Sequence, residues 1–569
     1  MGSFFGVLGH LTEDEKIKLS KFADNLKVIE IPNGYLFIRL KDPNIYCKQE
    51  LNKGFVISGL GIESTSEGFN NVNLANWEKY VYYPFNISFP DGHYCGISWI
   101  NNKTYFFNDI LGIKHLYTKN DDSKYYFSNS LFTLQQITNS FKLTQNEFFA
   151  AWFLNAKINY KPLIEGIERI NGINEFIGVN LTEHVEHEWI PTFNAKVNSN
   201  NFDVVLKKLM LFGLNRFQKF SLGLTAGLDS RLLLSYLLKS GRGNWVTHTF
   251  GDENLPDIIY SKNISTTLGF KHNIYNYELP KKEDLISTLA NYVSFTNISI
   301  PVSETIQFGM HNHFADLNTI TVDGSYGETY RRQMLNRLLI VGKEALYNKD
   351  FTQISKHLKS SRPNIFNTEL RSKIEESVIN SIAEIYELMP SLADISLENW
   401  LDIFAIKIKM PNTTAYSQHC LDTICTAVTI FLQPTLLKIG ISLPLEDRIN
   451  GRMFRELINK NAPTLKTFPL VKNNYSYPYN LGNKASYIYT KIKSKIFKQY
   501  NWTLNAKILD LSKEYLIDSI NSVNFKSDEL LNKNLITNSI YGYYKGEKEE
   551  NKTVTEWFLT YHLFTNFGR

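Results

Sequence analysis

Cysteine is scarce in this sequence of 569 residues, which contains only Cys47, Cys95, Cys420 and Cys425. No two of them form a Cys-x-x-Cys pair, and the spacing of His419 to its neighbouring cysteines fits no zinc template. Four cysteines in so long a chain do not make a disulfide framework, which favours a reducing compartment. We therefore expect a cytoplasmic protein whose cysteines are buried thiols.

A long hydrophobic run and a strong charge excess are also lacking. The longest apolar stretch, residues 424–445, contains Gln433, Pro434 and Lys438, so we expect no membrane span. The first residues lack the basic start and cleavage site of a signal peptide. The net charge is +5, and the short lysine cluster at 491–498 is typical of a solvated helix face rather than of a nucleic-acid interface. We therefore expect a soluble protein that binds no nucleic acid.

The first 195 residues are rich in predicted strands. Residues 34–40 favour a strand, and residues 94–107 favour a hairpin that turns at Asn101-Asn102. Helices are predicted at 12–23 and 145–153. The polar segment 191–201 is predicted to be a linker between two domains.

The pattern changes after residue 202. Strands predicted at 221–224, 245–250, 272–277 and 319–322 are separated by helical segments at 231–239 and 261–268. Alternating strands and helices indicate a parallel α/β sheet with crossover helices. After residue 335 the chain is expected to be largely helical.

One loop carries the clearest chemical signal. Residues 225–231, Thr-Ala-Gly-Leu-Asp-Ser-Arg, lie between a short apolar strand and an apolar helix. Small residues let backbone amides approach an anion, and the helix N-terminus adds partial positive charge. The hydroxyls of Thr225 and Ser230 can donate to phosphate oxygens, whereas Asp229 needs a bridging Mg²⁺. The segment predicts a pyrophosphate-binding loop; the alternative is a tight turn in which Asp229 or Ser230 caps the helix.

This loop resembles the PP-loop signature Ser-Gly-Gly-x-Asp-Ser of the asparagine synthetase family, with Thr225 for the first Ser and Ala226 for the first Gly. Residues 248–253 are similar to the strand that edges the family's adenine pocket. Residues 323–328, Asp-Gly-Ser-Tyr-Gly-Glu, are similar to its acidic nucleotide and metal loop. The family usually has Asp where Gly327 stands, so one metal ligand departs from the pattern, and Asp323 is the candidate to compensate.

The N-terminal half resembles the glutaminase domain of the same family at residues 107–117, 126–130 and 167–172. In a true glutaminase the residue after Met is Cys, whose thiolate attacks the glutamine amide. Here that position is Gly2. The resemblance therefore implies a half that keeps the fold without hydrolysing glutamine by the usual route.

The implied fold is α/β with two domains. Residues 1–195 would form a degenerate class II glutamine amidotransferase-like domain, an Ntn-hydrolase-like αββα sandwich. Residues 196–569 would form a PP-loop, adenine nucleotide alpha hydrolase-like, parallel α/β domain with helical additions.

The resemblance also assigns a site, with ATP and Mg²⁺ as cofactors. Asp229 and Glu328 are the implied metal ligands, and Glu328 and Lys472 the implied catalytic residues. Cations that could act near the α-phosphate are Arg231, Arg331, Arg332 and Lys472. The implied nucleotide-binding residues are Thr225, Ala226, Gly227, Leu228, Asp229, Ser230, Phe250, Gly251 and Gly324.

The implied function is an ATP-dependent amide ligase. It would adenylate a small-molecule, sugar or peptide carboxylate, release pyrophosphate and pass the acyl group to an amine or ammonia. Relatives without the cysteine include β-lactam synthetases and lasso peptide cyclases, and a homodimer or a biosynthetic partner protein is compatible with this activity. The alternative is a catalytically inactive asparagine synthetase-like scaffold that binds nucleotide or a partner protein. A PP-loop enzyme acting on tRNA is disfavoured by the missing basic stripe and zinc cysteines.

Overall fold

The computed structural model describes residues 3–566 except 23–24, 41, 43, 87, 122, 156, 188, 190, 192, 194–196, 317, 498–503 and 548. Gly2 and the predicted domain boundary between residues 195 and 196 lie outside the described residues. Within them the chain is of the α/β class, with several sheets that include a parallel one, as the sequence predicts.

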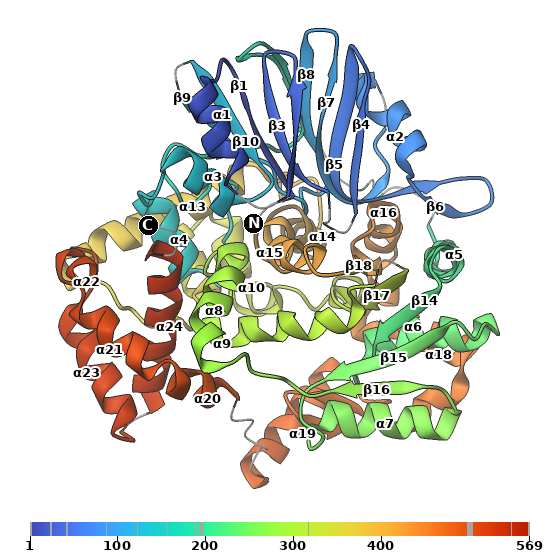
Figure 1. Ribbon diagram of the computed structural model, residues 1–569. Helices are drawn as coiled ribbons and strands as arrows, with labels where there is room; N and C mark the ends of the chain where they lie inside the picture. Colours follow the sequence, from blue (N-terminus) through green and yellow to red (C-terminus); the bar gives the residue numbers. More distant parts are fainter. Residues whose placement is uncertain are drawn as a thin grey trace.

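Two antiparallel sheets stack face to face at the top of Figure 1. Phe4 and Leu36 of one sheet share a hydrophobic core with Ile97 and Phe106 of the other, as in sheet sandwiches generally. The first sheet has the order β11-β9-β10-β1-β3-β2, with β1 (Phe4–Leu8), β2 (Leu26–Ile31), β3 (Gly34–Arg39), β9 (Tyr117–Asp121), β10 (Lys124–Ser128) and β11 (Glu168–Arg169). The second has the order β13-β12-β8-β7-β5-β4, with β4 (Ile45–Gln49), β5 (Lys53–Ser64), β6 (Phe69–Asn71) beside β5, β7 (Asp91–Ile100), β8 (Lys103–Asn108), β12 (Ile173–Ile177) and β13 (Asn180–Val185).

Helices cover the outer faces of this sandwich. Helix α1 (Glu13–Ser20) packs through Leu19 on the first sheet, and α2 (Leu74–Val81) packs through Trp77 on the second. Thr12 and Glu15 form a capping box at the start of α1. Two further helices, α3 (Leu131–Thr138) and α4 (Gln145–Phe153), follow β10. The layers are therefore α-β-β-α, and the predicted hairpin turn at residues 101–102 joins β7 to β8.

A five-stranded parallel sheet forms the second half, with the order β16-β15-β14-β17-β18. Strand β14 is central because the chain adds β15 and β16 on one side and β17 and β18 on the other. The predicted strand 272–277 is two residues too long, and β18 lies unpredicted inside the apolar run 424–445. The strands are β14 (Lys219–Gly223), β15 (Trp245–Phe250), β16 (His272–Tyr275), β17 (Thr319–Asp323) and β18 (Thr426–Thr429).

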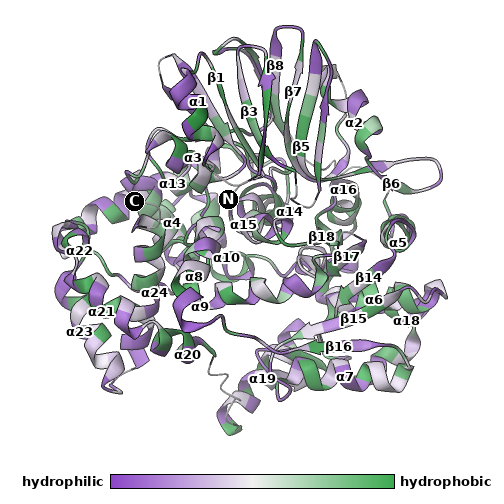
Figure 2. Ribbon diagram, in the orientation of Figure 1, coloured by the Kyte–Doolittle hydropathy of each residue, from purple (hydrophilic) through white to green (hydrophobic). Residues whose placement is uncertain are grey.

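Crossover helices bury the faces of this sheet. Helix α6 packs with α5 against β14, where Leu232 and Leu206 are fully buried. Figure 2 shows the hydrophobic residues gathered along the strands and the helix faces that cover them. The helices up to residue 461 are α5 (Ser199–Arg216), α6 (Leu228–Ser240), α7 (Pro256–Leu268), α8 (Lys282–Thr296), α9 (Val302–Thr305), α10 (Asn336–Val341), α11 (Lys343–Tyr347), α12 (Phe351–Leu358), α13 (Arg371–Glu387), α14 (Leu397–Phe404), α15 (Met410–Asp422), α16 (Pro434–Ser442), α17 (Leu445–Arg448) and α18 (Arg452–Asn461).

The C-terminal residues form a short hairpin and a group of helices, which lie at the lower left of Figure 1 from α20 onwards. Trp557 and Tyr561 of the last helix pack against Trp152 of α4, so the end of the chain is joined to its first third. None of the described helices is long and apolar enough to cross a membrane. The elements are β19 (Leu470–Lys472), β20 (Tyr475–Tyr477), α19 (Asn483–Ile496), α20 (Leu504–Leu511), α21 (Lys513–Asn521), α22 (Val523–Ser527), α23 (Lys533–Tyr544) and α24 (Glu549–Asn566).

Candidate active site

A cavity of about 530 Å³ opens at the carboxyl ends of the parallel strands. It lies where the strand order reverses, between β14 and β17, which is the usual ligand position in such sheets. Among the predicted site residues, Thr225, Gly227, Asp229, Ser230, Phe250 and Gly324 line it. Asp323, the candidate to compensate for Gly327, lines it as well, as does His248 of the strand expected to edge an adenine pocket. Residues that the sequence did not assign to the site also line it, notably Asp257, His311, Gln418 and Thr429. The described lining does not include Ala226, Leu228, Gly251, Glu328 or Lys472.

The loop after β14 is held in shape by its own side chains. The Ser230 hydroxyl accepts from the Thr225 amide at 3.2 Å and lies 3.1 Å from the Thr225 hydroxyl. The Thr225 hydroxyl accepts in turn from the amide of Gly227, the N-cap of α6, at 3.1 Å. The Ala226 amide is already donated to Asp257 Oδ1 at 2.8 Å. These hydrogen bonds fix the loop as a turn at the N-terminus of α6, and helix N-termini are positions where anions bind.

Asp229, the implied metal ligand, is ion-paired. Its Oδ2 lies 2.6 Å from Arg331 Nη2, and both side chains are mostly buried. Its Oδ1 is buried without a hydrogen-bond partner. Burial raises the pKa of Asp229, Arg331 opposes that shift, and the charge of Glu328 adds to it. No group of three His, Cys, Asp or Glu residues able to hold a metal ion exists within the part of the chain that the structure describes.

The acidic loop after β17 packs tightly on the loop Thr225–Ser230. A Cβ atom at Gly324 would lie 2.5 Å from the Ser230 amide nitrogen, and one at Gly327 would lie 2.4 Å from Cγ of Asp229. Position 327 therefore has no room for the Asp that the family pattern expects. Burial also raises the pKa of Asp323, and again the charge of Glu328 adds to the shift, so the Glu328 charge acts on both Asp229 and Asp323.

The other wall of the cavity is aromatic and uncharged. The Phe250 ring lies beside those of His248 and His311. Burial lowers the pKa of His248 to about 3 and that of His311 to about 4, so both rings are neutral at pH 7. Gly251 follows with a φ of +131°, a conformation that favours glycine. This wall can therefore pack on a flat heterocycle without adding charge.

Lys472 stands on a strand that is hydrogen-bonded to the candidate loop. The amide of Val471 donates to the Ala226 carbonyl at 3.3 Å, and Asn474, in the turn between β19 and β20, lines the cavity. No described residue accepts a hydrogen bond from the Lys472 ammonium or pairs with it. Lys472 therefore lies next to the loop, and its ammonium has no ion-pair partner among the described residues.

Arg231 and Arg332, two of the candidate cations, have structural partners instead. The fully buried Arg231 donates to the carbonyls of Ala226, Leu465, Phe468 and Pro469 and fixes the β19 segment to the loop. Arg332 lies 3.3 Å from the buried Asp402. Neither guanidinium is disposed to bind a phosphate, which overturns that part of the expectation because sequence spacing cannot show which charge is already paired.

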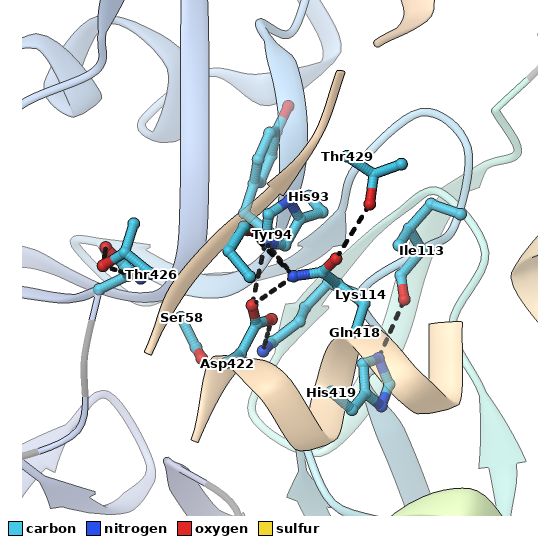
Figure 3. A network of polar contacts seen from close by, with 12 residues as sticks. Ser58, His93, Tyr94, Ile113, Lys114, Gln418, His419, Asp422, Thr426 and Thr429 are labelled. Carbon is cyan, nitrogen blue, oxygen red and sulfur yellow. Dashed lines mark hydrogen bonds and ion pairs between the residues drawn. The ribbon is translucent and has the colours of Figure 1, made fainter. Parts of the chain in front are cut away.

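A second polar cluster joins the stacked sheets to the far wall of the cavity (Figure 3). Asp422 of α15 lies 2.5 Å from Lys114, in the loop between β8 and β9, and 3.0 Å from His93 of β7. Gln418 donates to Asp422 at 2.8 Å and to the Ala427 carbonyl at 3.1 Å. Lys114 and His93 hold the pKa of the Asp422 carboxyl well below its ordinary value despite burial. The N-terminal half therefore supports the cavity wall through Asp422 and Gln418.

A further missed residue, Lys409, lies near the acidic loop. It ends a π-helical turn, Ala405–Lys409, between α14 and α15, and such turns are frequent at functional sites. Burial lowers its pKa, and Glu328 opposes that shift. A π-turn leaves little trace in hydrophobic periodicity, so the sequence offered no signal for it.

No family model and no curated protein matches the chain. Solved structures similar to it include NMN synthetase from Francisella tularensis, 14% identical over 24% of this chain and 58% of that one, with a TM-score of 0.18. NH3-dependent NAD synthetase from Campylobacter jejuni is 11% identical over 34% of this chain and 98% of that one, with a TM-score of 0.18. Glutamine phosphoribosylpyrophosphate amidotransferase from B. subtilis is 9% identical over 48% and 65%, with a TM-score of 0.19. Similarities this weak do not establish a shared fold. The fold class of this chain therefore rests on its sheets, and the candidate site rests on the geometry of the cavity.

Proposed function

We propose that this protein is an ATP-dependent ligase that adenylates a carboxylate and transfers the acyl group to an amine or ammonia. The observation that carries the proposal is the packing of the loop Thr225–Ser230 against the acidic loop at Asp323, beside a cavity at the switch point of a parallel sheet. We assign this sheet to a PP-loop domain of residues 196–569. We assign residues 1–195 to an Ntn-hydrolase-like sandwich without glutaminase activity.

The charges of the site support Mg²⁺ as well as ATP. Mg²⁺ bound to nucleotides takes one or two protein carboxylates and completes its shell with phosphate oxygens and water. Asp229 and Glu328 would hold it, and the unpartnered Oδ1 of Asp229 fits a ligand atom. When bound, the ion would neutralise the pyrophosphate that leaves. The hydroxyls of Thr225 and Ser230 would orient the phosphates, and the wall around Phe250 would pack on the adenine.

The reaction needs two displacements. A carboxylate oxygen of the substrate attacks the α-phosphorus, the bond from that phosphorus to the bridging oxygen breaks, and pyrophosphate leaves with the electron pair. An amine nitrogen then attacks the acyl carbon, AMP leaves as the carbon–oxygen bond breaks, and the nitrogen loses a proton. The Lys472 ammonium would stabilise charge on the phosphate, a role of oriented charge in catalysis. A small-molecule, sugar or peptide acid fits this scheme.

Exchange of labelled pyrophosphate into ATP, measured with a panel of carboxylic acids, tests the proposal. We expect exchange with at least one acid, and a loss of about 10²–10³-fold in Lys472→Met because one charge-stabilising donor is removed. ATP binding in Mg²⁺ should survive in Lys472→Met and fall in Asp229→Ala. The exposed Lys343, which heads α11, gives the matched control Lys343→Met.

Two observations favour a second candidate, an inactive scaffold that binds nucleotide or a partner protein. Asp229 is paired with Arg331, and Gly327 stands where a second acid is expected. Absence of exchange with every acid, together with ATP binding that Asp229→Ala leaves undiminished, would remove the ligase and leave the scaffold.

A further inference from the structure

The ion pair between Asp229 and Arg331 is incompletely satisfied. Only one oxygen of the carboxylate meets one terminal nitrogen of the guanidinium, at 2.6 Å. Asp229 Oδ1 and Arg331 Nε are both buried without hydrogen-bond partners. Arg–carboxylate pairs are frequently bidentate, with two parallel hydrogen bonds. This pair instead leaves one acceptor unused on Asp229, which lines the cavity, and one donor unused on its partner Arg331.

The surroundings of Arg331 fix its backbone and leave its side chain a choice of partner. The residue ends a short 3₁₀ turn, Gly327–Arg331, between Tyr326 with a φ of +71° and Arg332 with a φ of +52°. Non-glycine residues in this region are strained and gather at functional sites. The next residue, Arg332, is anchored by Asp402. Arg331 Nη1 donates to Gln333 at 2.8 Å, so a movement of the guanidinium needs side-chain rotation alone.

We propose that Arg331 is a polyphosphate-binding residue that Asp229 holds in reserve while the site is free of ligand. The inference rests on the proposed nucleotide site. Binding of the magnesium complex exchanges partners: the anion takes Arg331, and the metal takes Asp229. Before binding, Asp229 and Arg331 neutralise each other. After binding, Mg²⁺ would neutralise Asp229 and the anion would neutralise Arg331. Neither side chain is left with an uncompensated buried charge, which would be strongly destabilising.

The experiment measures binding of inorganic pyrophosphate to the full-length protein by calorimetry, once in EDTA and once in Mg²⁺. Arg331→Gln should weaken binding in both conditions by about ten- to a hundredfold, the value of one lost charge-assisted hydrogen bond. Asp229→Asn should tighten binding in EDTA, because it frees Arg331, and should abolish the gain that Mg²⁺ gives. Arg331→Lys should restore part of the affinity. Arg337→Gln, an exposed arginine on α10, is the matched control and should change nothing.

The double variant Asp229→Asn/Arg331→Gln separates partner exchange from simple repulsion. If Arg331 binds the anion, the gain of Asp229→Asn in EDTA disappears in the double variant, which is a coupling energy in a double-mutant cycle. If the gain persists, Asp229 only repels pyrophosphate and the inference is overturned. Unchanged affinity in Arg331→Gln and Arg331→Lys overturns it as well, and Arg331→Lys serves where Arg331→Gln does not fold.

These outcomes are independent of catalysis. If the variants change pyrophosphate binding as expected but no acid supports ATP–pyrophosphate exchange, the binding role of Arg331 stands and the ligase proposal fails. If ATP–pyrophosphate exchange occurs and the Arg331 variants bind pyrophosphate normally, the ligase proposal stands and the binding role of Arg331 fails.

Discussion

Asp229 lines the cavity, Asp422 lies behind the lining residue Gln418, and the surroundings of these two carboxylates differ. Asp422 meets Lys114 with one oxygen and both His93 and Gln418 with the other. Asp229 meets Arg331 with one oxygen and nothing with the other. The same residue type therefore has a lowered pKa at 422 and a raised one at 229.

The difference separates support from function. A buried charge whose hydrogen bonds are all made holds its neighbours in one arrangement. A buried charge with an unused lone pair is costly unless a ligand completes it. Asp422 thus fixes the joint between the N-terminal half and α15, whereas Asp229 keeps one carboxylate oxygen without a hydrogen-bond partner. Through His93 of β7 and Lys114 of the loop after β8, the N-terminal half supports this wall.

The largest expected effect is on stability. Asp422→Asn should lower the free energy of unfolding by about 3–5 kcal/mol, because Lys114 would remain buried with its charge uncompensated. Asp229→Asn should lower it by less, because the wild-type pair makes a single hydrogen bond and already leaves Asp229 Oδ1 without a partner. Urea denaturation of the two variants beside the wild type checks this. Equal losses would contradict the division between support and function.

How much of the fold and of the candidate site can be predicted from the sequence depends on whether the residues concerned are neighbours along the chain. The loop 225–230 can be singled out from the sequence as a candidate site because its small residues, hydroxyls and acid are consecutive and lie between a strand and a helix. Strand β18 was missed because residues 424–445 are apolar throughout, and periodicity cannot separate a buried strand from a buried helix.

The partners of Asp229 and Asp422 were unpredictable for a different reason. Arg331 is 102 positions from Asp229, and Lys114 is 308 from Asp422. Such pairs exist only once the fold brings distant segments together. An acid in the apolar sequence around Asp422 signals a buried partner but does not name it.

The next effect is steric and sharpens the functional side of the comparison. Gly327→Ala places a methyl group 2.4 Å from Cγ of Asp229, so the carboxylate must move. We expect a loss of about 1–3 kcal/mol in the free energy of unfolding, as for other overpacked sites, and weaker binding of magnesium pyrophosphate. Gly243→Ala is the matched control, since a Cβ there meets nothing within 4 Å. Unaltered pyrophosphate binding in Gly327→Ala would show that the position of Asp229 is unimportant to the ligand.

The smallest effect is on the pH dependence of stability, and its sign distinguishes the two carboxylates. A carboxyl whose folded pKa is lowered stabilises the fold above its unfolded pKa of about 3.9 and loses that contribution as the pH falls through the folded value. The advantage of wild type over Asp422→Asn should therefore be constant from pH 7 to pH 5 and shrink below about pH 4.

A raised folded pKa has the opposite consequence, because ionisation then favours the unfolded chain. Wild type should lose stability relative to Asp229→Asn as the pH rises from about 4. Urea midpoints of the three proteins across this range would show two slopes of opposite sign, and slopes of the same sign would mean that the two sites differ in geometry but not in electrostatics.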